Sequence, residues 1–256
     1  MNLVIPAGTM LRPDDRGVLY GEGVFETLWI RDGVARLRAA HLARMARSAA
    51  LLGIPLPDPA PLVDQAEEAW PAAKGEGALR LVATAGPAGG EPVLYATVSP
   101  VPPEVIAQRA DGVRVVTAGA GVSCERPGWS LTTAKTISYA ANLAARRSVA
   151  GADLLWISTE GYALESPTAG LVWLEQGVLH GVAGDGVLPS VTVAHLLLTE
   201  NGRAGFVRPA ELHEADGIWL ASALRGLVEV RELDGRPRAR SSATGRLQEI
   251  VSRRPG

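Results

Sequence analysis

Strand-like and helix-like segments alternate along almost the whole chain, and this alternation favours a fold that mixes both. Short runs rich in β-branched and aromatic residues are separated by amphipathic segments and by turns rich in glycine and proline. At 256 residues the chain is long enough for one large domain or two modest ones, with a substantial buried core. We therefore expect an α/β (α+β) fold with mixed sheets.

The positions of these segments predict two halves joined by a loop. Helices are expected at residues 39–52, 58–73, 139–150 and 191–201. Strands are expected at residues 3–5, 18–30, 34–37, 79–85, 93–98, 113–118, 153–157, 170–174, 217–221 and 227–230. A polar, glycine-containing stretch at 119–130 divides a small N-terminal α/β domain (1–118) from a larger C-terminal domain (131–256), and the Arg/Ser-rich stretch 236–246 is expected to be exposed.

Charge and composition exclude several classes of function. The net charge is −2 and no basic stripe is interleaved with aromatic residues, so we expect neither nucleic acid nor an anionic membrane as a partner. The start of the chain does not resemble a signal peptide, and no apolar run approaches the roughly 20 residues that span a bilayer. Cys124 is the only cysteine and the four histidines are scattered, so we expect no disulfide, no metal site and a cytoplasmic protein.

Lysine is almost absent from this sequence, and one of its two lysines lies in an unusual place. Of the 25 basic residues only Lys74 and Lys135 are lysines. Lys74 lies in a polar loop, where a solvated role is natural, whereas Lys135 lies in the nearly uncharged stretch LTTAKTISY. An arginine cannot lose its proton to form an imine, but a desolvated lysine can. Lys135 is therefore a candidate for imine chemistry; the alternative is a lysine that snorkels to the surface.

Imine chemistry in proteins commonly uses pyridoxal 5'-phosphate (PLP), which needs a carboxylate for its ring nitrogen and donors for its phosphate. Glu165 is the candidate carboxylate, although an exposed glutamate is the ordinary interpretation. The free N–H groups of Val191 and Thr192, at a predicted helix start, are candidate phosphate donors or an ordinary helix cap. Arg44 is a candidate phosphate arginine, and the hydroxyl of Tyr139 could reach the 3-oxygen of the cofactor or simply lie at the edge of the core.

Six segments, in order, resemble the signature segments of the class IV aminotransferase family. In that family the second carries the phosphate arginine, the third the imine lysine, the fourth the glutamate that faces the pyridine ring, and the fifth and sixth form the phosphate cup. They are DRGVLYGEGVFETL at 15–28, HLARM at 41–45, KTISY at 135–139, LESPT at 164–168, LPSVT at 188–192 and IWLASAL at 218–224. The resemblance covers residues 15 to 235 and assigns Arg44, Lys135, Tyr139, Glu165, Val191, Thr192, Ser222 and Ala223 to the cofactor site.

The resemblance also implies an architecture, that of a fold type IV PLP enzyme like the D-amino acid aminotransferases. Two α/β domains would hold the cofactor between them, with PLP bound mainly by the C-terminal domain, and the loop 119–130 would cover the site. The family implies a homodimer. Ser222 and Ala223 replace a Gly-Thr pair that is frequent in branched-chain enzymes, and Ala85 stands where an arginine that meets the substrate carboxylate is common.

The short length, the strand Leu79-Arg80-Leu81 and the turn from Ser222 to Gly226 are most similar to 4-amino-4-deoxychorismate lyases. Such a lyase releases pyruvate and forms 4-aminobenzoate, a step of folate biosynthesis, from a small amino substrate. The alternative is an aminotransferase acting on D-amino acids or branched-chain L-amino acids, which would use the same cofactor residues. A remoter alternative is an inactive relative with a scaffold role. Phe25, Thr27 and Arg225 are the candidates for contact with the substrate.

Overall fold

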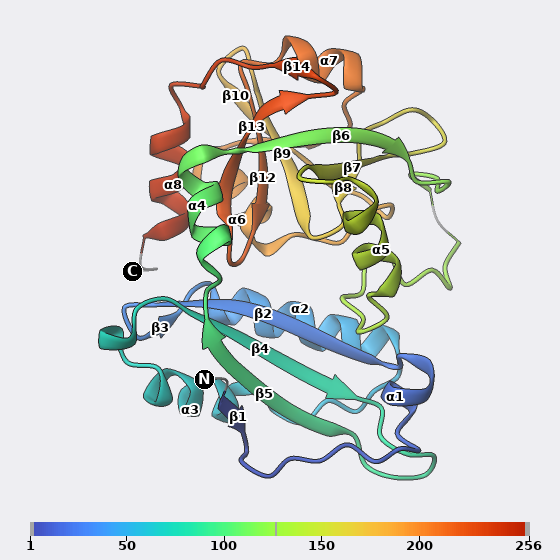
Figure 1. Cartoon of the computed structure of the whole chain (residues 1–256). Coiled ribbons are helices and arrows are strands. Elements are labelled where there is room, and N and C mark those ends of the chain that lie inside the picture. Colours follow the sequence, from blue (N-terminus) through green and yellow to red (C-terminus); the bar gives the residue numbers. More distant parts are fainter. Residues whose placement is uncertain (1–2, 126, 254–256) are drawn as a thin grey trace. The chain divides into compact units, whose positions relative to one another are not determined.

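The computed structural model describes residues 3–125 and 127–253, and these form two compact units (Figure 1). Unit 1 comprises the chain up to Pro102 together with Ala134–Tyr139. Unit 2 comprises Pro103–Thr133 and the chain that follows Tyr139. Each unit has its own sheet and its own hydrophobic core, so each is described separately.

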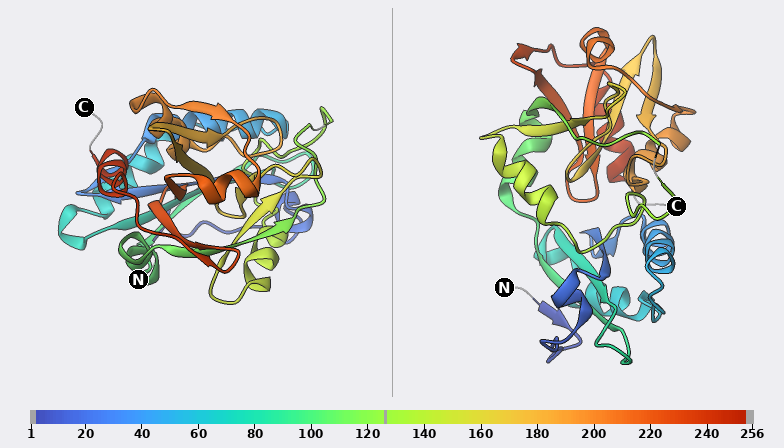
Figure 2. Two further views of the ribbon diagram at one scale, coloured as in Figure 1. Left: turned by 90° about the horizontal axis from the view of Figure 1, so that it is seen from above. Right: turned by 90° about the vertical axis from the view of Figure 1, so that its right-hand side faces the viewer.

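Unit 1 is built on a five-stranded antiparallel sheet with the order β1-β5-β4-β2-β3. The strands are β1 (Leu3–Ile5), β2 (Gly23–Arg31), β3 (Val34–Ala35), β4 (Gly77–Thr84) and β5 (Val93–Pro100). The helices are α1 (Arg16–Tyr20), α2 (Arg38–Leu51), α3 (Ala60–Ala69) and the short 3-10 helix η1 (Ala72–Lys74). Helices α2 and α3 pack on the same face of the sheet (Figure 2).

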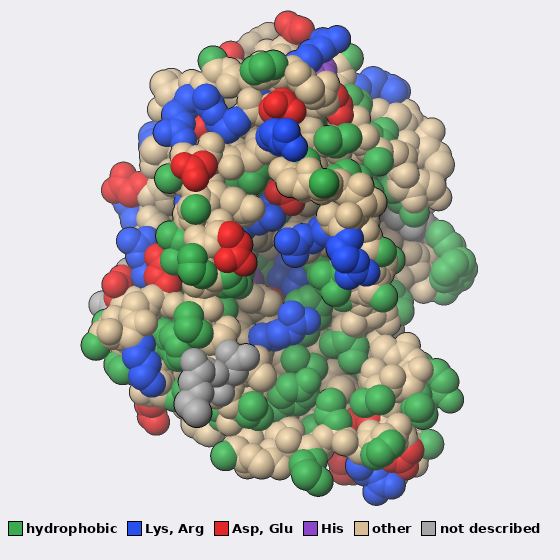
Figure 3. Space-filling view, viewed as in Figure 1, with side chains coloured by type: hydrophobic (Ala, Val, Ile, Leu, Met, Phe, Trp, Pro, Cys, Tyr) green, Lys and Arg blue, Asp and Glu red, His purple; other side chains and the backbone are tan. Residues whose placement is uncertain are grey.

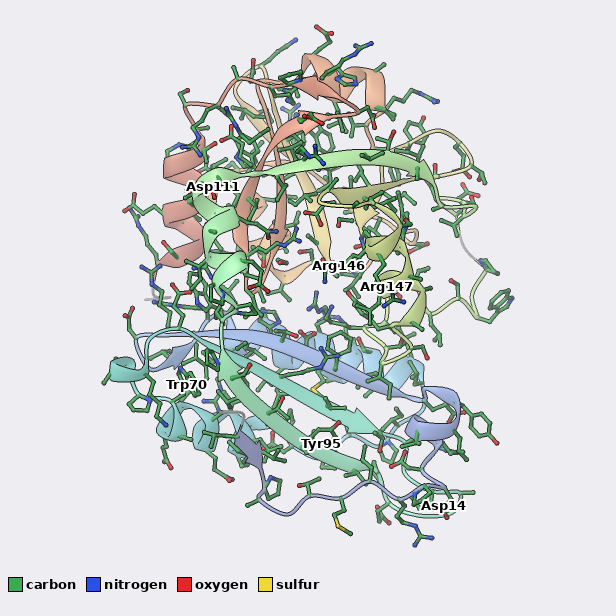
Figure 4. The ribbon with its side chains drawn as sticks, viewed as in Figure 1. Asp14, Trp70, Tyr95, Asp111, Arg146 and Arg147 are labelled. Carbon is green, nitrogen blue, oxygen red and sulfur yellow. The ribbon has the colours of Figure 1, made fainter. Side chains whose placement is uncertain are left out.

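The two faces of this sheet differ because side chains alternate along each strand. Val24, Leu28 and Ile30 of β2 belong to the core beneath α2 and α3. The opposite face, which we call the outer face, carries Phe25 in register with Val82 and Tyr95, and Thr27 in register with Arg80 and Thr97. Hydrophobic side chains gather on the outer face (Figure 3), and Tyr95 lies on it (Figure 4).

Unit 2 is built on a nine-stranded mixed sheet with the main order β11-β10-β9-β12-β13-β6-β7. Its strands are β6 (Val113–Gly119), β7 (Asp153–Ile157), β8 (Glu165–Ser166), β9 (Ala169–Glu175), β10 (Val178–Val182), β11 (Arg203–Gly205), β12 (Gly217–Ser222), β13 (Gly226–Leu233) and β14 (Arg236–Pro237). The pairs β10–β11, β13–β6 and β6–β7 are parallel, and the other pairs are antiparallel.

Two helices of unit 2 cover the centre of this sheet. The helices of the whole unit are α4 (Pro103–Asp111), α5 (Ala140–Ser148), α6 (Val191–Thr199), α7 (Pro209–Glu214) and α8 (Thr244–Ser252). Helices α6 and α8 pack on each other and on the strands around Trp219, whose indole N–H donates to the Thr244 hydroxyl at 3.0 Å. Arg146 and Arg147 project from the last turn of α5 (Figure 4), where cations complement the helix dipole. Among the described residues, no helix combines the length and apolar character needed to cross a bilayer.

The mixed α/β class is confirmed, but three helices lie where the sequence indicated something else. Residues 18–20 were expected to begin a strand and instead belong to α1, because Asp15 caps this turn by accepting from the Gly17 N–H at 2.7 Å. Helix α4 begins within the stretch at 99–104, whose prolines indicated no helix, because Pro103 is tolerated in a first helical turn. Helix α8 begins inside the Arg/Ser-rich stretch expected to be exposed, since Leu247, Ile250 and Val251 bury one face of it.

Two stretches also lie in a different unit from the expected domain. Residues 103–118 join unit 2, because β6 pairs in parallel with β7 and β13. Residues Ala134–Tyr139 join unit 1, because they hydrogen-bond to β2. Lys135 is therefore held by the N-terminal half of the chain, although 131–256 was the expected C-terminal domain.

Candidate functional site

The backbone around Lys135 is fixed by β2 and α2. The Phe25 N–H donates to the Lys135 carbonyl at 3.0 Å, and the Ile137 N–H donates to the Gly23 carbonyl at 2.9 Å. The Lys135 N–H donates to the Ser48 hydroxyl of α2 at 3.0 Å. The segment therefore adds a short pairing to the edge of β2, and the position of Lys135 is set by the strand that carries Phe25.

Two glycines of the segment at 15–28 allow this close approach. Gly21 has a φ of +72°, and a Cβ built on it would lie 2.2 Å from the Ser138 hydroxyl. A Cβ on Gly23 would lie 2.7 Å from both the Ala83 carbonyl oxygen and Cδ1 of Ile137. Side chains at these positions would push the lysine segment away from the sheet. Gly21 and Gly23 therefore allow the segment that contains Lys135 to lie close to β2.

The Lys135 side chain lies among aromatic rings. Its Nζ is 4.5 Å from the centroid of the Phe25 ring and 5.5 Å from that of Tyr139. The two rings meet edge to face with centroids 5.2 Å apart. An ammonium group is attracted to ring faces, whereas a neutral amine loses that attraction. The structure thus brings together Lys135 and Tyr139, expected on the cofactor side, and Phe25, expected on the substrate side.

Arg44 is buried in unit 1 and paired with Glu26. His41, Arg44 and Ser48 lie on one face of α2 because they are three and four residues apart. Arg44 donates from Nε and Nη2 to the two oxygens of Glu26 at 2.6 and 2.7 Å, and Nδ1 of His41 is 2.8 Å from Glu26 Oε2. Glu26 reaches them from the helix-covered face of β2.

The charges in this cluster follow from its burial. Burial alone would raise the pKa of Glu26, but hydrogen bonds from Arg44 and His41 outweigh it and hold that pKa at about 2. Burial lowers the pKa of His41; the Glu26 carboxylate opposes this effect, and the positive charges of Arg44 and Lys135 add to it. Because an ionised carboxylate only accepts, a neutral His41 carries its proton on Nδ1 and donates it to Glu26.

In unit 2 the predicted carboxylate lies beside the predicted phosphate site. Glu165 on β8 is in register with Gly170 on β9, and the Leu188 N–H donates to Glu165 Oε1 at 3.0 Å. A Cβ on Gly170 would lie 2.8 Å from Val193 and 3.1 Å from Ser190, so the bare glycine lets the start of α6 rest on β9. The structure therefore brings Glu165 and the α6 N-terminus together.

The start of α6 offers backbone donors. The Ser190 hydroxyl accepts from the Val193 N–H at 3.3 Å, as a helix cap does. Helix geometry leaves the N–H groups of Val191 and Thr192 without an acceptor inside the helix, at its positive end. Ala221, at the end of β12, is also in register with Gly170, so the turn that follows, with Ser222 and Ala223, begins next to this site.

Arg225 is buried in unit 2 and paired with Asp153. Its Nη1 and Nη2 donate to the two carboxylate oxygens of Asp153 at 2.8 and 3.1 Å, and both side chains are less than a tenth exposed. This buried pair fastens the β12–β13 turn to the start of β7. Because both terminal nitrogens of its guanidinium are paired with Asp153, a structural role is favoured for Arg225.

Sequence reasoning missed two groups in unit 1. Glu26 lies inside the first family segment but was given no role of its own. Arg80 extends from β4 on the outer face, with its guanidinium 4.0 Å from the centroid of the Phe25 ring that Lys135 also contacts. No ion pair joins Arg80 to a carboxylate among the described residues. The structure places Arg80 directly opposite Thr27 in register, a pairing that no local sequence pattern indicates.

Comparisons with known proteins show the family of the chain. The family model for class IV amino-transferases matches residues 23–233. A bifunctional aminodeoxychorismate lyase / D-amino acid transaminase of Mycobacterium tuberculosis is 37% identical, with 96% of this chain and 93% of that protein covered. A putative branched-chain-amino-acid aminotransferase of Methanocaldococcus jannaschii is 29% identical, with 87% and 82% covered.

Solved structures show the same similarity in three dimensions. A PLP-bound hypothetical aminotransferase from M. tuberculosis superposes with a TM-score of 0.92 at 34% identity, covering 98% of this chain and 97% of that one. A 4-amino-4-deoxychorismate lyase from Pseudomonas aeruginosa superposes with a TM-score of 0.79 at 28% identity, covering 98% of both chains.

Proposed function

This chain belongs to the class IV aminotransferase family, and we propose that it is a PLP-dependent 4-amino-4-deoxychorismate lyase. It would convert its substrate to 4-aminobenzoate and pyruvate. The observation that carries the proposal is the outer face of unit 1, where the amine of Lys135 and the guanidinium of Arg80 contact the same Phe25 ring. A base and an anion-binding group beside one aromatic surface suit an amino substrate that carries a carboxylate.

The residues present fit PLP. Lys135 supplies the amine for the aldehyde, and Glu165, held by the Leu188 N–H, supplies the carboxylate for the ring nitrogen. The phosphate would be bound by Arg44 and by the N–H groups that start α6, those of Val191 and Thr192, with Ser222 and Ala223 beside them. Tyr139 would face the 3-oxygen. When bound, PLP withdraws electrons from the substrate carbon that bears the amine.

Lys135 would perform the proton transfers. Its amine, when free, would take the proton from the substrate carbon that bears nitrogen. In the lyase reaction the bond between the ring and the enolpyruvyl oxygen then breaks. The enolpyruvyl group leaves and takes up a proton to become pyruvate, while the ring becomes aromatic as 4-aminobenzoate. No second amino acid is consumed.

Arg80 would bind a carboxylate of the substrate. It lies on the outer face opposite Thr27, and its guanidinium contacts Phe25. Guanidinium groups recognise carboxylates through two parallel hydrogen bonds. This assignment adds Arg80 to Phe25 and Thr27 on the substrate side, and leaves Arg225 as the partner of Asp153.

D-amino acid transamination is the second candidate function. It is favoured by the M. tuberculosis relative whose name combines both activities, and by the structure of a hypothetical M. tuberculosis aminotransferase with α-ketoglutarate. The same residues would serve it. The difference is that no carbon–oxygen bond breaks: the amino group passes to a keto acid such as α-ketoglutarate, the amino donor becomes a keto acid, and Lys135 would move the protons.

We also propose that the protein acts as a homodimer. In unit 1 the apolar side chains of Met10, Val18, Leu19 and Tyr20 are each more than half exposed, and no residue of α1 is buried. An apolar run that covers nothing within its own unit suits a second copy of this chain. Light scattering after size-exclusion chromatography should give a molar mass twice that of the chain. The double variant Leu19→Asp/Tyr20→Asp should give the mass of the monomer.

The decisive assay supplies 4-amino-4-deoxychorismate to the PLP-loaded protein without a keto acid. We expect equal amounts of 4-aminobenzoate and pyruvate. Lys135→Ala should abolish both products, and Lys74→Ala, the other lysine, should change neither. A second assay supplies D-alanine and α-ketoglutarate. If it yields pyruvate while the first assay yields no 4-aminobenzoate, the protein is a transaminase and the lyase proposal is wrong.

A further inference from the structure

We propose that Glu26 is a positioning residue that orients Arg44 toward the phosphate of the cofactor, with His41 as the group that orients Glu26. The inference rests on the proposed function, because it takes Arg44 as a phosphate ligand. Glu26 was not among the residues that the family segments assign to the site. It acts through Arg44 and does not itself contact the cofactor.

The geometry of the pair carries the proposal. Glu26 is fully buried, and Arg44 is 6% exposed. Both oxygens of Glu26 accept from Arg44, one from Nε and one from Nη2. Two parallel hydrogen bonds fix the plane of a guanidinium as well as its distance. The pair therefore fixes the direction in which the whole guanidinium of Arg44 lies.

His41 completes the arrangement. It lies one turn before Arg44 on α2, and its Nδ1 is 2.8 Å from the oxygen of Glu26 that also accepts from Arg44 Nη2. A neutral His41 donates one hydrogen bond and adds no charge. Glu26 is therefore held from two positions on one helix, while the Glu26–Arg44 pair is close to neutral overall.

Burial explains why this orientation would be specific. A guanidinium buried without a carboxylate is strongly unfavourable, and a pair with good geometry removes most of that cost. A long, flexible arginine would otherwise need to be ordered when the phosphate arrives. With Glu26 in place, that order exists before the cofactor binds. We therefore expect Glu26 to strengthen the binding of the phosphate group and to leave the binding of the pyridoxal part of the cofactor unchanged.

The test compares PLP with pyridoxal, which lacks the phosphate. The apoprotein is titrated with each compound, and binding is followed by the absorbance of the bound cofactor. We expect Glu26→Gln to weaken PLP binding by about tenfold, or about 1.4 kcal/mol, while pyridoxal binding changes less than twofold. The matched control is Asp64→Asn. Asp64 on α3 pairs at 2.6 Å with Arg38, which lies on α2 as Arg44 does, and its replacement should change neither affinity.

A second comparison separates positioning from a general structural role. If Glu26 acts through Arg44, Glu26→Gln should add little to the loss of PLP affinity already caused by Arg44→Lys. Equal weakening of PLP and pyridoxal by Glu26→Gln, or additive losses in the double variant, would overturn the proposal. If Glu26→Gln does not fold, Glu26→Asp, with the charge kept and the reach shortened, must still weaken PLP more than pyridoxal. Failure of the wild type to bind PLP would instead overturn the proposed function.

Discussion

The buried pair of Arg225 and Asp153 makes a quantitative prediction about the role of Arg225. Both terminal nitrogens of Arg225 are engaged at 2.8 and 3.1 Å, and the two side chains are 8% and 6% exposed. Asp153→Asn would leave the guanidinium buried without its carboxylate, which costs about 3–5 kcal/mol. In a protein of this size each kcal/mol lowers the melting temperature by about 2–4 °C, so a fall of at least about 6 °C is expected.

A double replacement separates stability from substrate binding. Asp153→Leu with Arg225→Met removes both charges and keeps apolar volume, so melting should return close to that of the wild type. Thermal unfolding is followed by circular dichroism, and the KM for the amino substrate is measured on the same samples. If Arg225 is structural, the double variant keeps the wild-type KM. An Asp153→Asn protein that melts like the wild type would refute the energetic reasoning, and a tenfold rise of KM in a stable double variant would return Arg225 to the substrate site.

Three further predictions concern the cofactor site. Glu165→Gln should retain PLP but lose activity by about a hundredfold or more, because an amide cannot keep the ring nitrogen protonated; unchanged turnover would contradict the role of Glu165. Gly23→Ala should destabilise by about 1–3 kcal/mol in urea unfolding, because its Cβ would lie 2.7 Å from Ile137, whereas Gly245→Ala, with no atom within 4 Å, should not. The pKa of Glu26 is about 2 in the folded protein, below its usual value, so its stabilisation is complete above about pH 4.5 and lost as the pH falls toward 2; acid unfolding that is identical in Glu26→Gln would contradict this.

The sequence predicted the long elements of the fold well, because their periodicity is unambiguous. Helix α2, expected at 39–52, is Arg38–Leu51, and β7 was expected at the residues where it lies. Helix α1 was missed because five residues are too few to show a helical period, and its exposed Val18, Leu19 and Tyr20 are typical of a strand. Helix α8 was missed because arginines and serines obscure its three buried apolar residues.

The candidate site was predicted in part, and its unpredicted parts depend on contacts between distant residues. Lys135, Phe25 and Tyr139 lie together in unit 1, and Glu165 lies beside the start of α6 in unit 2, as the order of the segments suggested. The partner of Arg225 is 72 residues away along the chain, so no local pattern could indicate that this arginine is buried. The role of Glu26 likewise depends on which face of β2 meets α2.

The covalent attachment of the cofactor tests the central claim most directly. The PLP-loaded protein is reduced with borohydride, digested and mapped by mass spectrometry. We predict a pyridoxyl group on the peptide that contains Lys135 and none on the peptide that contains Lys74. A label on Lys74, or a protein that binds PLP but yields no labelled lysine, would contradict the account.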